Sequence, residues 1–328
     1  MKILVTGATG FIGSHVAEKL LQKGYDVRCI IRKTSNLRWL EGKKFDLIEA
    51  SLADKKELER ATVDVDYIYH IAGNTSAKNL AEYMQGNCQG TINLIEAALS
   101  NAPNLKRFLY VSSQTAAGPA ASLTQPITEN MPMQPITDYG RSKKAAEEAV
   151  NSYSSRLPFT IVRPPAVYGQ RDTEIFSIFK MIQMGLIAYM GFDKKSLSIV
   201  HSEDLSNGII EAAESQNTIG KTYFVSSDEF YDWKDIYQLM KKHLGKNFTV
   251  NIHLPHFLVL GAGAISGLLG KFSAKPPVFN YQKGIDFIQQ FWICSTENAA
   301  KDFGYKQKIS LEQGIEETIK WYKEMKWL

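Results

Sequence analysis

The stretch "KILVTGATGFIGSHVAEKLLQKG", residues 2–24, decides the fold of this chain. It opens with a short β-branched run, turns through Gly7, Gly10 and Gly13, and continues as an amphipathic pattern typical of a helix. A strand, a glycine turn and a helix in this order let the backbone approach a pyrophosphate at the positive end of the helix. The stretch therefore predicts the first βα unit of a dinucleotide-binding domain.

Further β-prone runs repeat this alternation along the first half of the chain. They occupy residues 26–31, 45–50, 66–72, 107–113 and 159–164, and helical patterns follow nearly every one of them. Strands separated by helices of this length need crossover connections, so they pair in parallel and are buried on both faces. We therefore expect an α/β fold built on a doubly wound parallel (Rossmann) sheet.

The rhythm changes after about Gly169. We expect residues 1–170 to form the nucleotide-binding domain and residues 171–328 to form mainly a smaller carboxyl-terminal substrate-binding cap. Residues 197–215 have the pattern of one more strand and helix, which would rejoin the first domain. Ligands of open α/β sheets bind at the carboxyl ends of the strands, so the predicted cleft between the two lobes lies there.

Composition narrows the class of protein. The 328 residues are 44% hydrophobic and carry a net charge of +4 without a basic run, which indicates a globular protein and argues against nucleic acid as a partner. The cysteines Cys29, Cys88 and Cys294 are widely separated and have no metal-site or disulfide spacing. An apolar run from residue 3 leaves no room for a signal peptide. We expect a cytoplasmic protein that binds a small-molecule substrate and no metal.

A charge-free segment occupies residues 247–270 and contains the apolar run "FLVLGAGAISGLL". The run is too short and too rich in glycine to predict a membrane span. We therefore expect no integral membrane insertion and interpret the segment as a buried helix, with peripheral membrane contact as the alternative.

The end of the second strand indicates which dinucleotide binds. A carboxylate about 20 positions after the glycine turn would accept the ribose 2′-hydroxyl of NAD. Here the residue 19 positions after Gly13 is Arg32, and no carboxylate lies between Asp26 and Glu41. Arg32 and Lys33 suit a 2′-phosphate, which favours NADP over NAD; the alternative is a solvated strand end.

Four motifs occur in a fixed order: "TGATGFIG" at residues 6–13, "VSSQTAAG" at 111–118, "YGRSK" at 139–143 and "VRPPAVYG" at 162–169. With them the sequence resembles the extended (atypical) short-chain dehydrogenase/reductase family, of the NAD-dependent epimerase/dehydratase type. The resemblance covers essentially the whole chain. The run from "AKPP" at residue 274 to residue 305 is most similar to the dihydroflavonol reductase and 3β-hydroxysteroid dehydrogenase branches.

This resemblance implies the catalytic residues. Tyr139 would be the general acid/base, Lys143 would support it, and Ser113 would hold the substrate oxygen, with Ser112 as the alternative serine. A nearby ammonium and the positive ring of the oxidised cofactor would lower the pKa of the Tyr139 phenol toward neutrality. Asn87 resembles the asparagine that orders the backbone behind the active lysine.

The resemblance also implies the residues that contact the cofactor. They are Gly7, Thr9, Gly10, Phe11, Ile12, Gly13, Arg32, Lys33, Leu52, Ala72, Val111, Tyr139, Lys143, Pro164 and Val167. Where the family often has an aspartate that meets the adenine, this chain has Ser51, with Asp54 three positions later, which leaves that contact open. His70 lies in a buried strand pattern and is interpreted as a core histidine. A homodimer is common in the family and is implied here only by analogy.

The two residues after the catalytic serine and the composition of the cap narrow the reaction. Dehydratases of the family carry an Asp-Glu pair where this chain has Gln114 and Thr115, which argues against dehydration. Nucleotide-sugar enzymes need groups that grip a diphosphate, usually arginines. Residues 172–328 contain no arginine, although Arg141 and Arg171 are expected near the cleft.

The cap offers apolar side chains instead, which would form either its core or the wall of a pocket: Phe176, Phe179, Met181, Met184, Tyr189 and Phe192. We therefore predict an NADP-dependent oxidoreductase that interconverts a ketone and a secondary alcohol on a fairly apolar molecule. A nucleotide-sugar epimerase is the alternative. A non-enzymatic NADP(H) sensor is disfavoured, because such a protein would have lost the tyrosine that this chain keeps at residue 139.

Overall fold

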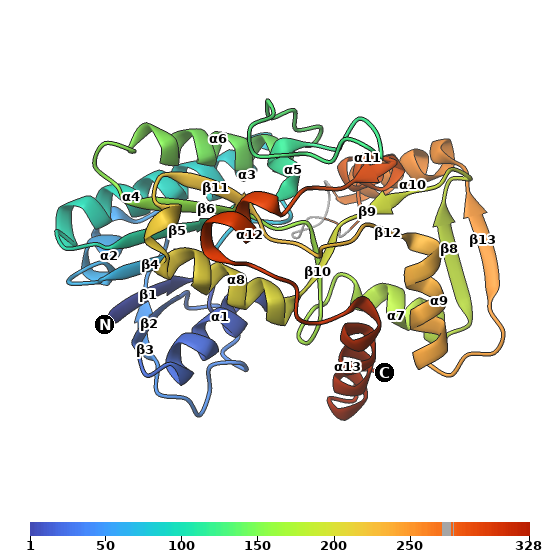
Figure 1. Ribbon diagram of the computed structural model, residues 1–328, viewed down its shortest axis with the longest axis horizontal. Helices are drawn as coiled ribbons and strands as arrows, with labels where there is room; N and C mark the ends of the chain where they lie inside the picture. The colour runs from blue at the N-terminus through green and yellow to red at the C-terminus, as the bar shows by residue number, and fades with distance from the viewer. Residues whose placement is uncertain (271–276, 278) are drawn as a thin grey trace.

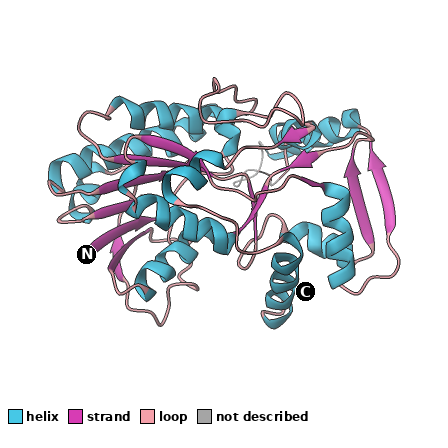
Figure 2. Ribbon diagram, in the orientation of Figure 1, coloured by secondary structure: helices cyan, strands magenta, loops and turns pink. Residues whose placement is uncertain are grey.

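A seven-stranded parallel sheet forms the larger lobe in the computed structural model, which describes residues 1–270, 277 and 279–328. Figures 1 and 2 show this sheet in the left half of the molecule, with helices on both faces. The strand order is β11-β6-β5-β4-β1-β2-β3, and every neighbouring pair runs parallel. The strands are β1 (Lys2–Thr6), β2 (Asp26–Ile31), β3 (Asp46–Glu49), β4 (Tyr67–His70), β5 (Arg107–Val111), β6 (Phe159–Arg163) and β11 (Lys221–Phe224). The predicted doubly wound fold and its first six strands are confirmed.

The apolar strands are buried because helices cover both faces of the sheet. Every residue of β4, β5 and β6 is buried. On one face, α1 (Phe11–Gln22) and α8 (Ser202–Glu214) share a core with the sheet. On the other face, α2 (Lys55–Ala61), α4 (Gly90–Asn101) and α6 (Asp138–Ser152) form a second core. Between these helices lie α3 (Leu80–Tyr83), the π-helix η1 (Met84–Gln89) and α5 (Gln114–Ala117).

The smaller lobe occupies the right half of Figure 1 and has its own apolar core. A parallel pair, β8 and β13, lies at its outer end, and short ladders pair β7 with β10 and place β9 between β12 and β14. Its helices are α7 (Phe176–Gln183), α9 (Trp233–His243), α10 (His256–Gly270), α11 (Tyr281–Ile288) and α13 (Leu311–Glu324). Its strands are β7 (Ala166–Tyr168), β8 (Leu186–Met190), β9 (Ser196–Leu197), β10 (Ile199–His201), β12 (Tyr231–Asp232), β13 (Val250–Leu254) and β14 (Phe291–Trp292).

Several later segments lie with the large sheet. α8 packs against α1, β5 and β6, and β11 is an edge strand of the sheet. α12 (Glu297–Phe303) contacts β11, α8 and the 3₁₀ turn η2 (Gln216–Thr218). Within residues 197–215 only the helix joins the larger lobe, because the short strands there pair outside the seven-stranded sheet. The division of the chain near residue 170 stays a prediction.

The charge-free segment forms β13 and α10, and its predicted burial is wrong for one face of the helix. Val259 and Gly263 are buried where α10 packs against α11, whereas Phe257 is 70% exposed and Ile265 is 64% exposed. α10 has 15 residues, and none of the helices within the described ranges is long and apolar enough to cross a bilayer. Of the run that begins at residue 274, residues 274–276 and 278 lie outside the described residues.

Candidate active site at the carboxyl edge of the sheet

The glycine turn after β1 forms a close-packed cradle. Gly7 has φ of +75°, and a Cβ there would lie 2.8 Å from the Ala72 nitrogen. A Cβ on Gly13 would lie 2.1 Å from the Gly7 oxygen, so both positions require glycine. Gly10 is the N-cap of α1 and offers no side chain to the first N–H groups of the helix. This cradle fits the pyrophosphate of a dinucleotide.

The structure brings the other predicted cofactor residues to the same edge of the sheet. Because all seven strands are parallel, their carboxyl ends meet there. Thr9, Phe11 and Ile12 lie in the turn and the start of α1, Leu52 follows β3, Ala72 follows β4, Val111 ends β5, Pro164 follows β6, and Val167 lies in β7. Their contacts with a cofactor stay a prediction.

Arg32 and Lys33 are exposed just after β2. The Arg32 backbone N–H donates to Ser35 Oγ at 2.9 Å, which fixes the turn, and Lys33 Nζ lies 3.7 Å from Glu49 Oε1. No carboxylate of the described residues forms an ion pair with the Arg32 guanidinium. Arg32 is therefore the better placed of the two cations to meet an anionic ligand.

The residues after β3 are used locally. Asp54 is the N-cap of α2, and its Oδ1 accepts a hydrogen bond from the Glu57 nitrogen at 3.1 Å. The Ser51 nitrogen donates to Glu57 Oε2 at 2.8 Å. Asp54 thus stabilises the start of a helix, which explains its presence without any adenine contact.

His70 is a hydrogen-bonded core histidine, as the sequence predicts. Its Nδ1 lies 2.7 Å from Thr6 Oγ1, and its Nε2 lies 2.9 Å from Thr91 Oγ1. Burial lowers the pKa of His70 to about 3, so the imidazole is neutral at physiological pH. The residue ties β4 to β1 and α4.

Ser113 and Tyr139 meet where α5 and α6 approach each other. Ser113 caps α5 by accepting from the Thr115 nitrogen, and its hydroxyl lies near enough to the Tyr139 phenol to lower the pKa of that phenol. Thr137 caps α6 by accepting from the Gly140 nitrogen at 3.2 Å. A Cβ on Gly140 would lie 2.4 Å from the Thr115 oxygen, so α5 and α6 can pack this closely only because residue 140 is glycine.

Ser112 is committed to a buried ion pair. Its Oγ donates to Glu147 Oε1 at 2.5 Å, and Glu147 Oε2 accepts from Arg163 Nη2 at 2.6 Å. All three side chains are buried. Ser112 is thus bound to Glu147, whereas the Ser113 hydroxyl is near enough to Tyr139 to lower the pKa of its phenol. The ion pair was not predicted, although a charged residue at the end of a buried strand, Arg163, was a signal that a partner should exist.

Lys143 lies one helical turn after Tyr139 and is only 3% exposed. Its Nζ donates to the Val111 oxygen at 2.8 Å and lies 4.3 Å from the centre of the Tyr110 ring. The carbonyl at the end of β5 therefore orients the lysine toward the edge of the sheet where the glycine turn also lies.

Asn87 supports this arrangement from η1, and its predicted position behind the lysine agrees with the structure. Its Oδ1 accepts from the Asn74 nitrogen at 2.6 Å, and its Nδ2 donates to Ser142 Oγ at 2.9 Å. A Cβ on Gly73 would lie 3.2 Å from Asn87 Oδ1 and 3.8 Å from Lys143 Nζ. Asn87 thus links the loop after β4 to the catalytic helix.

Burial shifts the pKa of Tyr139 away from the expected direction. Desolvation raises the pKa of the phenol well above 10; the charge of Glu174 adds to the rise, and the nearby Ser113 hydroxyl opposes it. Burial also lowers the pKa of Lys143 to about 7, against the attraction of Glu147. The expectation also counted the positive ring of the oxidised cofactor, so it stays a prediction for the cofactor-bound site; the cost of burying both groups works against it.

α11 brings a carboxyl group of the smaller lobe close to Tyr139. Gln282 Oε1 accepts from the Asp138 nitrogen at 3.1 Å, so α11 touches the first turn of α6. Asp286 lies one turn further along the same face of α11. Its Oδ1 is buried and accepts no hydrogen bond within the described part of the chain. Its charge raises the pKa of both Tyr139 and Tyr83, and burial raises the pKa of Asp286 itself to about 7. Nothing in the sequence distinguished this aspartate.

Arg171 does not face the substrate side, although the sequence predicts it near the cleft. Its Nη1 donates to Ser14 Oγ at 3.1 Å and its Nη2 to Glu18 Oε2 at 2.5 Å, both on α1. Its guanidinium lies 5.0 Å from the centre of the Trp39 ring, which in turn packs on Trp321 of α13. The strong ion pair with α1 holds this arginine away from the cleft.

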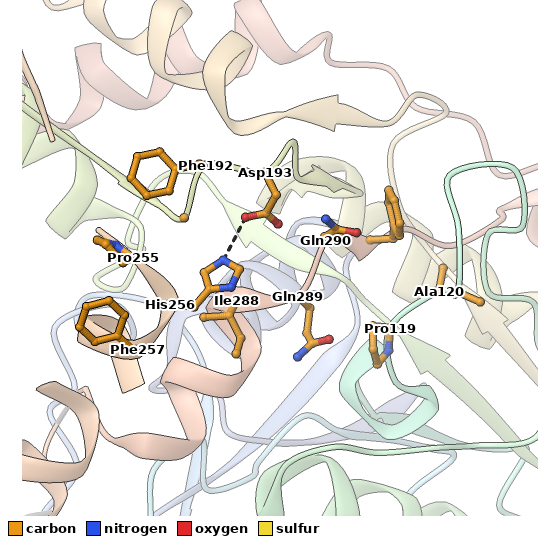
Figure 3. Close-up of a pocket in the computed structure, with 13 residues that line it drawn as sticks. Pro119, Ala120, Phe192, Asp193, Pro255, His256, Phe257, Ile288, Gln289 and Gln290 are labelled. Atoms are coloured by element: carbon orange, nitrogen blue, oxygen red, sulfur yellow. Dashed lines mark ion pairs between the residues drawn. The ribbon is translucent and has the colours of Figure 1, made fainter. Parts of the chain in front are cut away.

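Two cavities of the smaller lobe share the segment around Phe192. The larger cavity has a volume of about 680 Å³. The loop after α5 lines one side of it, and the start of α10 and the segment that follows α11 line the rest, as Figure 3 shows. The smaller, of about 340 Å³, is lined by apolar side chains that include Met181, Tyr189 and Phe192. Of the other apolar cap residues singled out from the sequence, Phe176 and Phe179 pack in the core of the lobe and Met184 is exposed. Neither cavity is lined by an arginine.

Comparisons with known proteins agree with this architecture. The sequence model of the "NAD dependent epimerase/dehydratase family" matches residues 3–226, more than half of the chain. The chain is 26% identical to a ceramide reductase of Caulobacter vibrioides, over 99% of this chain and 96% of that protein. It is 25% identical to a decarboxylating sterol-4-alpha-carboxylate 3-dehydrogenase of Dictyostelium discoideum, over 96% and 99%. The crystal structure of a UDP-glucose 4-epimerase from Thermotoga maritima has the same fold, with a TM-score of 0.81, 22% identity and 99% of each chain covered.

The depressed pKa of Lys143 predicts how stability depends on pH. The folded-state pKa of about 7 lies below the ordinary value of 10.5, so between these values the unfolded chain holds a proton that the folded chain has released. The free energy of unfolding should therefore rise with pH in this window, by at most about 1.4 kcal/mol per pH unit, relative to Lys143→Met. Urea unfolding at several pH values measures the difference, and Lys144→Met controls for losing a lysine from the same helix. If the difference in the free energy of unfolding between the wild type and Lys143→Met did not change with pH, the lowered pKa of Lys143 would be contradicted.

Asp286→Asn should stabilise the protein, because the amide removes a buried charge that has no hydrogen-bond donor among the described residues. The folded-state pKa of about 7 lies above the ordinary 3.8, so the gain should be small near pH 4 and complete above pH 7. There we expect about 1–3 kcal/mol in the free energy of unfolding. The same substitution at the exposed Asp26, Asp26→Asn, is the control. Equal changes of the free energy of unfolding in the two variants would contradict an unfavourable buried charge at Asp286.

Proposed function

Because the chain belongs to the NAD dependent epimerase/dehydratase family, the extended type of short-chain dehydrogenase/reductase, we propose that it is an NADP-dependent oxidoreductase that interconverts a ketone and a secondary alcohol. The observation that carries the proposal is the placement of the Ser113 hydroxyl beside the Tyr139 phenol, with Lys143 buried one turn further along the same helix. We propose further that the substrate is a fairly apolar small molecule.

The residues of the site have complementary tasks in this reaction. When bound in the glycine cradle, the dinucleotide supplies the hydride for reduction or accepts it in oxidation. Tyr139 gives its phenol proton to the carbonyl oxygen during reduction and takes a proton from the alcohol in the reverse direction. Ser113 donates to the same oxygen and keeps it beside the phenol. Such positioned proton transfer contributes roughly 10²- to 10⁴-fold to a rate.

Lys143 adjusts the charge of the site. With a pKa of about 7, it can carry a proton or release one near physiological pH. In the ammonium form it stabilises the phenolate that Tyr139 becomes after giving up its proton. The hydrogen bond to the Val111 carbonyl keeps the lysine at this place in either form.

Asp286 places a carboxyl group of the smaller lobe close enough to Tyr139 to affect the pKa of its phenol. Its buried Oδ1 is an acceptor that lacks a donor within the described part of the chain, and it lies near Tyr139. A hydroxyl or amide N–H of the substrate would satisfy it. We therefore propose that the substrate carries a hydrogen-bond donor close to its ketone or alcohol.

The apolar character of the remaining substrate is supported by the relatives and by the smaller lobe. Two of the relatives that share about a quarter of their residues with the chain are named for ceramide and sterol substrates, which are lipids, whereas others of equal identity are named for UDP-glucose and dTDP-D-glucose. The 340 Å³ cavity is mainly apolar, although its lining also includes Asp193 and Lys195 and contains none of the three proposed catalytic residues. Arg171, the last arginine of the chain, is bound to α1 and does not offer a guanidinium to a diphosphate.

Turnover of a substrate panel tests this proposal. Aryl and polycyclic ketones and flavanonols should oxidise NADPH, whereas UDP- and dTDP-sugars should show no epimerisation. Tyr139→Phe should lower ketone reduction by at least about 100-fold without weakening NADPH binding, since only the proton donor is lost. Epimerisation of a nucleotide sugar without net consumption of cofactor would establish the epimerase alternative instead.

The preference for NADP is tested by Arg32→Ala. A charge-assisted hydrogen bond contributes about 1.5–3 kcal/mol, so NADPH binding should weaken about 10- to 150-fold while NADH binding stays nearly constant. Calorimetric titration with both cofactors measures this, and Lys33→Ala is the matched control with a smaller expected effect. A wild-type protein that binds NADH more tightly than NADPH would refute the preference.

A further inference from the structure

The outer face of α10 is an apolar surface that no described element covers. Its largest exposed side chains are Phe257, Leu258, Ile265, Leu268 and Leu269, which are 49–70% exposed. They recur at helical spacing, and the positions between them on the same face, 261 and 262, are glycine and alanine. The face therefore contains no polar side chain. Contiguous exposed apolar surface of this kind marks a place of interaction.

The inner face of α10 explains why the helix nevertheless holds its position. A Cβ on Gly263 would lie 2.8 Å from the Asn280 oxygen, so α10 packs closely against the start of α11. Ser266 Oγ also donates to the Phe279 oxygen at 2.7 Å. α10 is thus anchored to the protein along one side and presents its apolar side outward, at the end of the smaller lobe that lies at the upper right of Figure 1.

The larger cavity opens beside this face. Phe257 belongs both to the apolar face and to the lining of the cavity. Figure 3 shows the Phe192 side chain, which is 76% exposed, on the same side of the cavity as Phe257. Pro119 and Ala120 line the opposite side, in the loop that follows α5. That loop begins at the helix that Ser113 caps. The cavity therefore extends from α10 toward the elements that hold the catalytic residues.

We propose that the apolar face of α10 rests on the surface of a lipid bilayer, with the 680 Å³ cavity opening toward the membrane. α10 is too short to span a bilayer, so it lies in the interfacial plane. Most amphipathic helices that lie on a membrane turn a charged face toward water. In this protein the face of α10 opposite the apolar one packs against α11 instead. The role of the cavity as the entrance for substrate rests on the proposed function, since an apolar ketone partitions into lipid.

A second copy of the chain fits this face less well. Protein interfaces surround an apolar centre with a polar rim and form about one hydrogen bond per 100–200 Å². The outer face of α10 has no side-chain donor or acceptor, and a partner seated on Phe257 would also cover the cavity. A bilayer requires neither hydrogen bonds nor a matching shape.

Flotation with vesicles of phosphatidylcholine and phosphatidylglycerol, without substrate or cofactor, tests the proposal. The wild-type protein should float with the vesicles, and Leu268→Glu/Leu269→Glu should lower the bound fraction by at least about tenfold, because two apolar contacts are lost. The matched control is Phe248→Glu/Val250→Glu, which adds the same charge at two exposed positions, one two residues before β13 and one at its start, and should bind as the wild type does. Both doubles should keep the wild-type melting temperature and the wild-type reduction of a water-soluble ketone.

Three results would overturn the proposal: no flotation of the wild type, equal loss of binding in both double variants, or a dimer in light scattering that only Leu268→Glu/Leu269→Glu dissociates. The last result would assign the face to a second copy. Flotation is measured without turnover, so a protein that does not float with vesicles would leave the proposed reaction unaffected. If no ketone were reduced in the activity assay, the flotation result would still decide whether the protein binds a bilayer.

Discussion

A buried ion pair between Glu147 and Arg163 holds the catalytic helix against the sheet. Glu147 lies one turn beyond Lys143 on α6, and Arg163 ends β6; the side chains of Arg163 and Glu147 are 5% and 1% exposed. Removing one partner of such a pair leaves a buried charge and costs about 3–5 kcal/mol. α6 therefore cannot slide along the sheet without a large penalty. The positions of Tyr139 and Lys143 relative to the strand ends depend on a contact outside the reacting groups.

Patterns within the sequence were enough to predict the strands and the glycine turn of the larger lobe. The strands are buried on both faces and therefore appear as apolar runs, and the glycine turn appears because a Cβ at Gly7 or Gly13 would collide with the backbone. Contacts between distant segments leave no such mark. Asp138 meets Gln282 across 144 positions of the chain, so the approach of α11 and Asp286 to the site could not be predicted. The choice of Ser113 over Ser112 came from a family motif, and the geometry gives its physical reason.

Composition does not state how deeply a group is covered, and two expectations depend on that depth. The sequence indicates the effect of Lys143 on Tyr139 from its charge, whereas burial of both groups works in the opposite direction. The apolar run of α10 predicts a buried helix, whereas only the side facing α11 is covered. In both cases the residue type is informative, but its environment depends on elements far away in the sequence.

The contacts of Arg171 bear on how the two lobes can move. This residue stands where the chain leaves the larger lobe, and it joins Glu18 on α1 to Trp39, which packs on Trp321 of the carboxyl-terminal helix. Any swing of the lobes about residue 171 would have to break this ion pair and separate the tilted Trp39 and Trp321 rings together. The junction therefore resists such a swing, whereas α10 and α11, at the far end of the smaller lobe, are held mainly by each other.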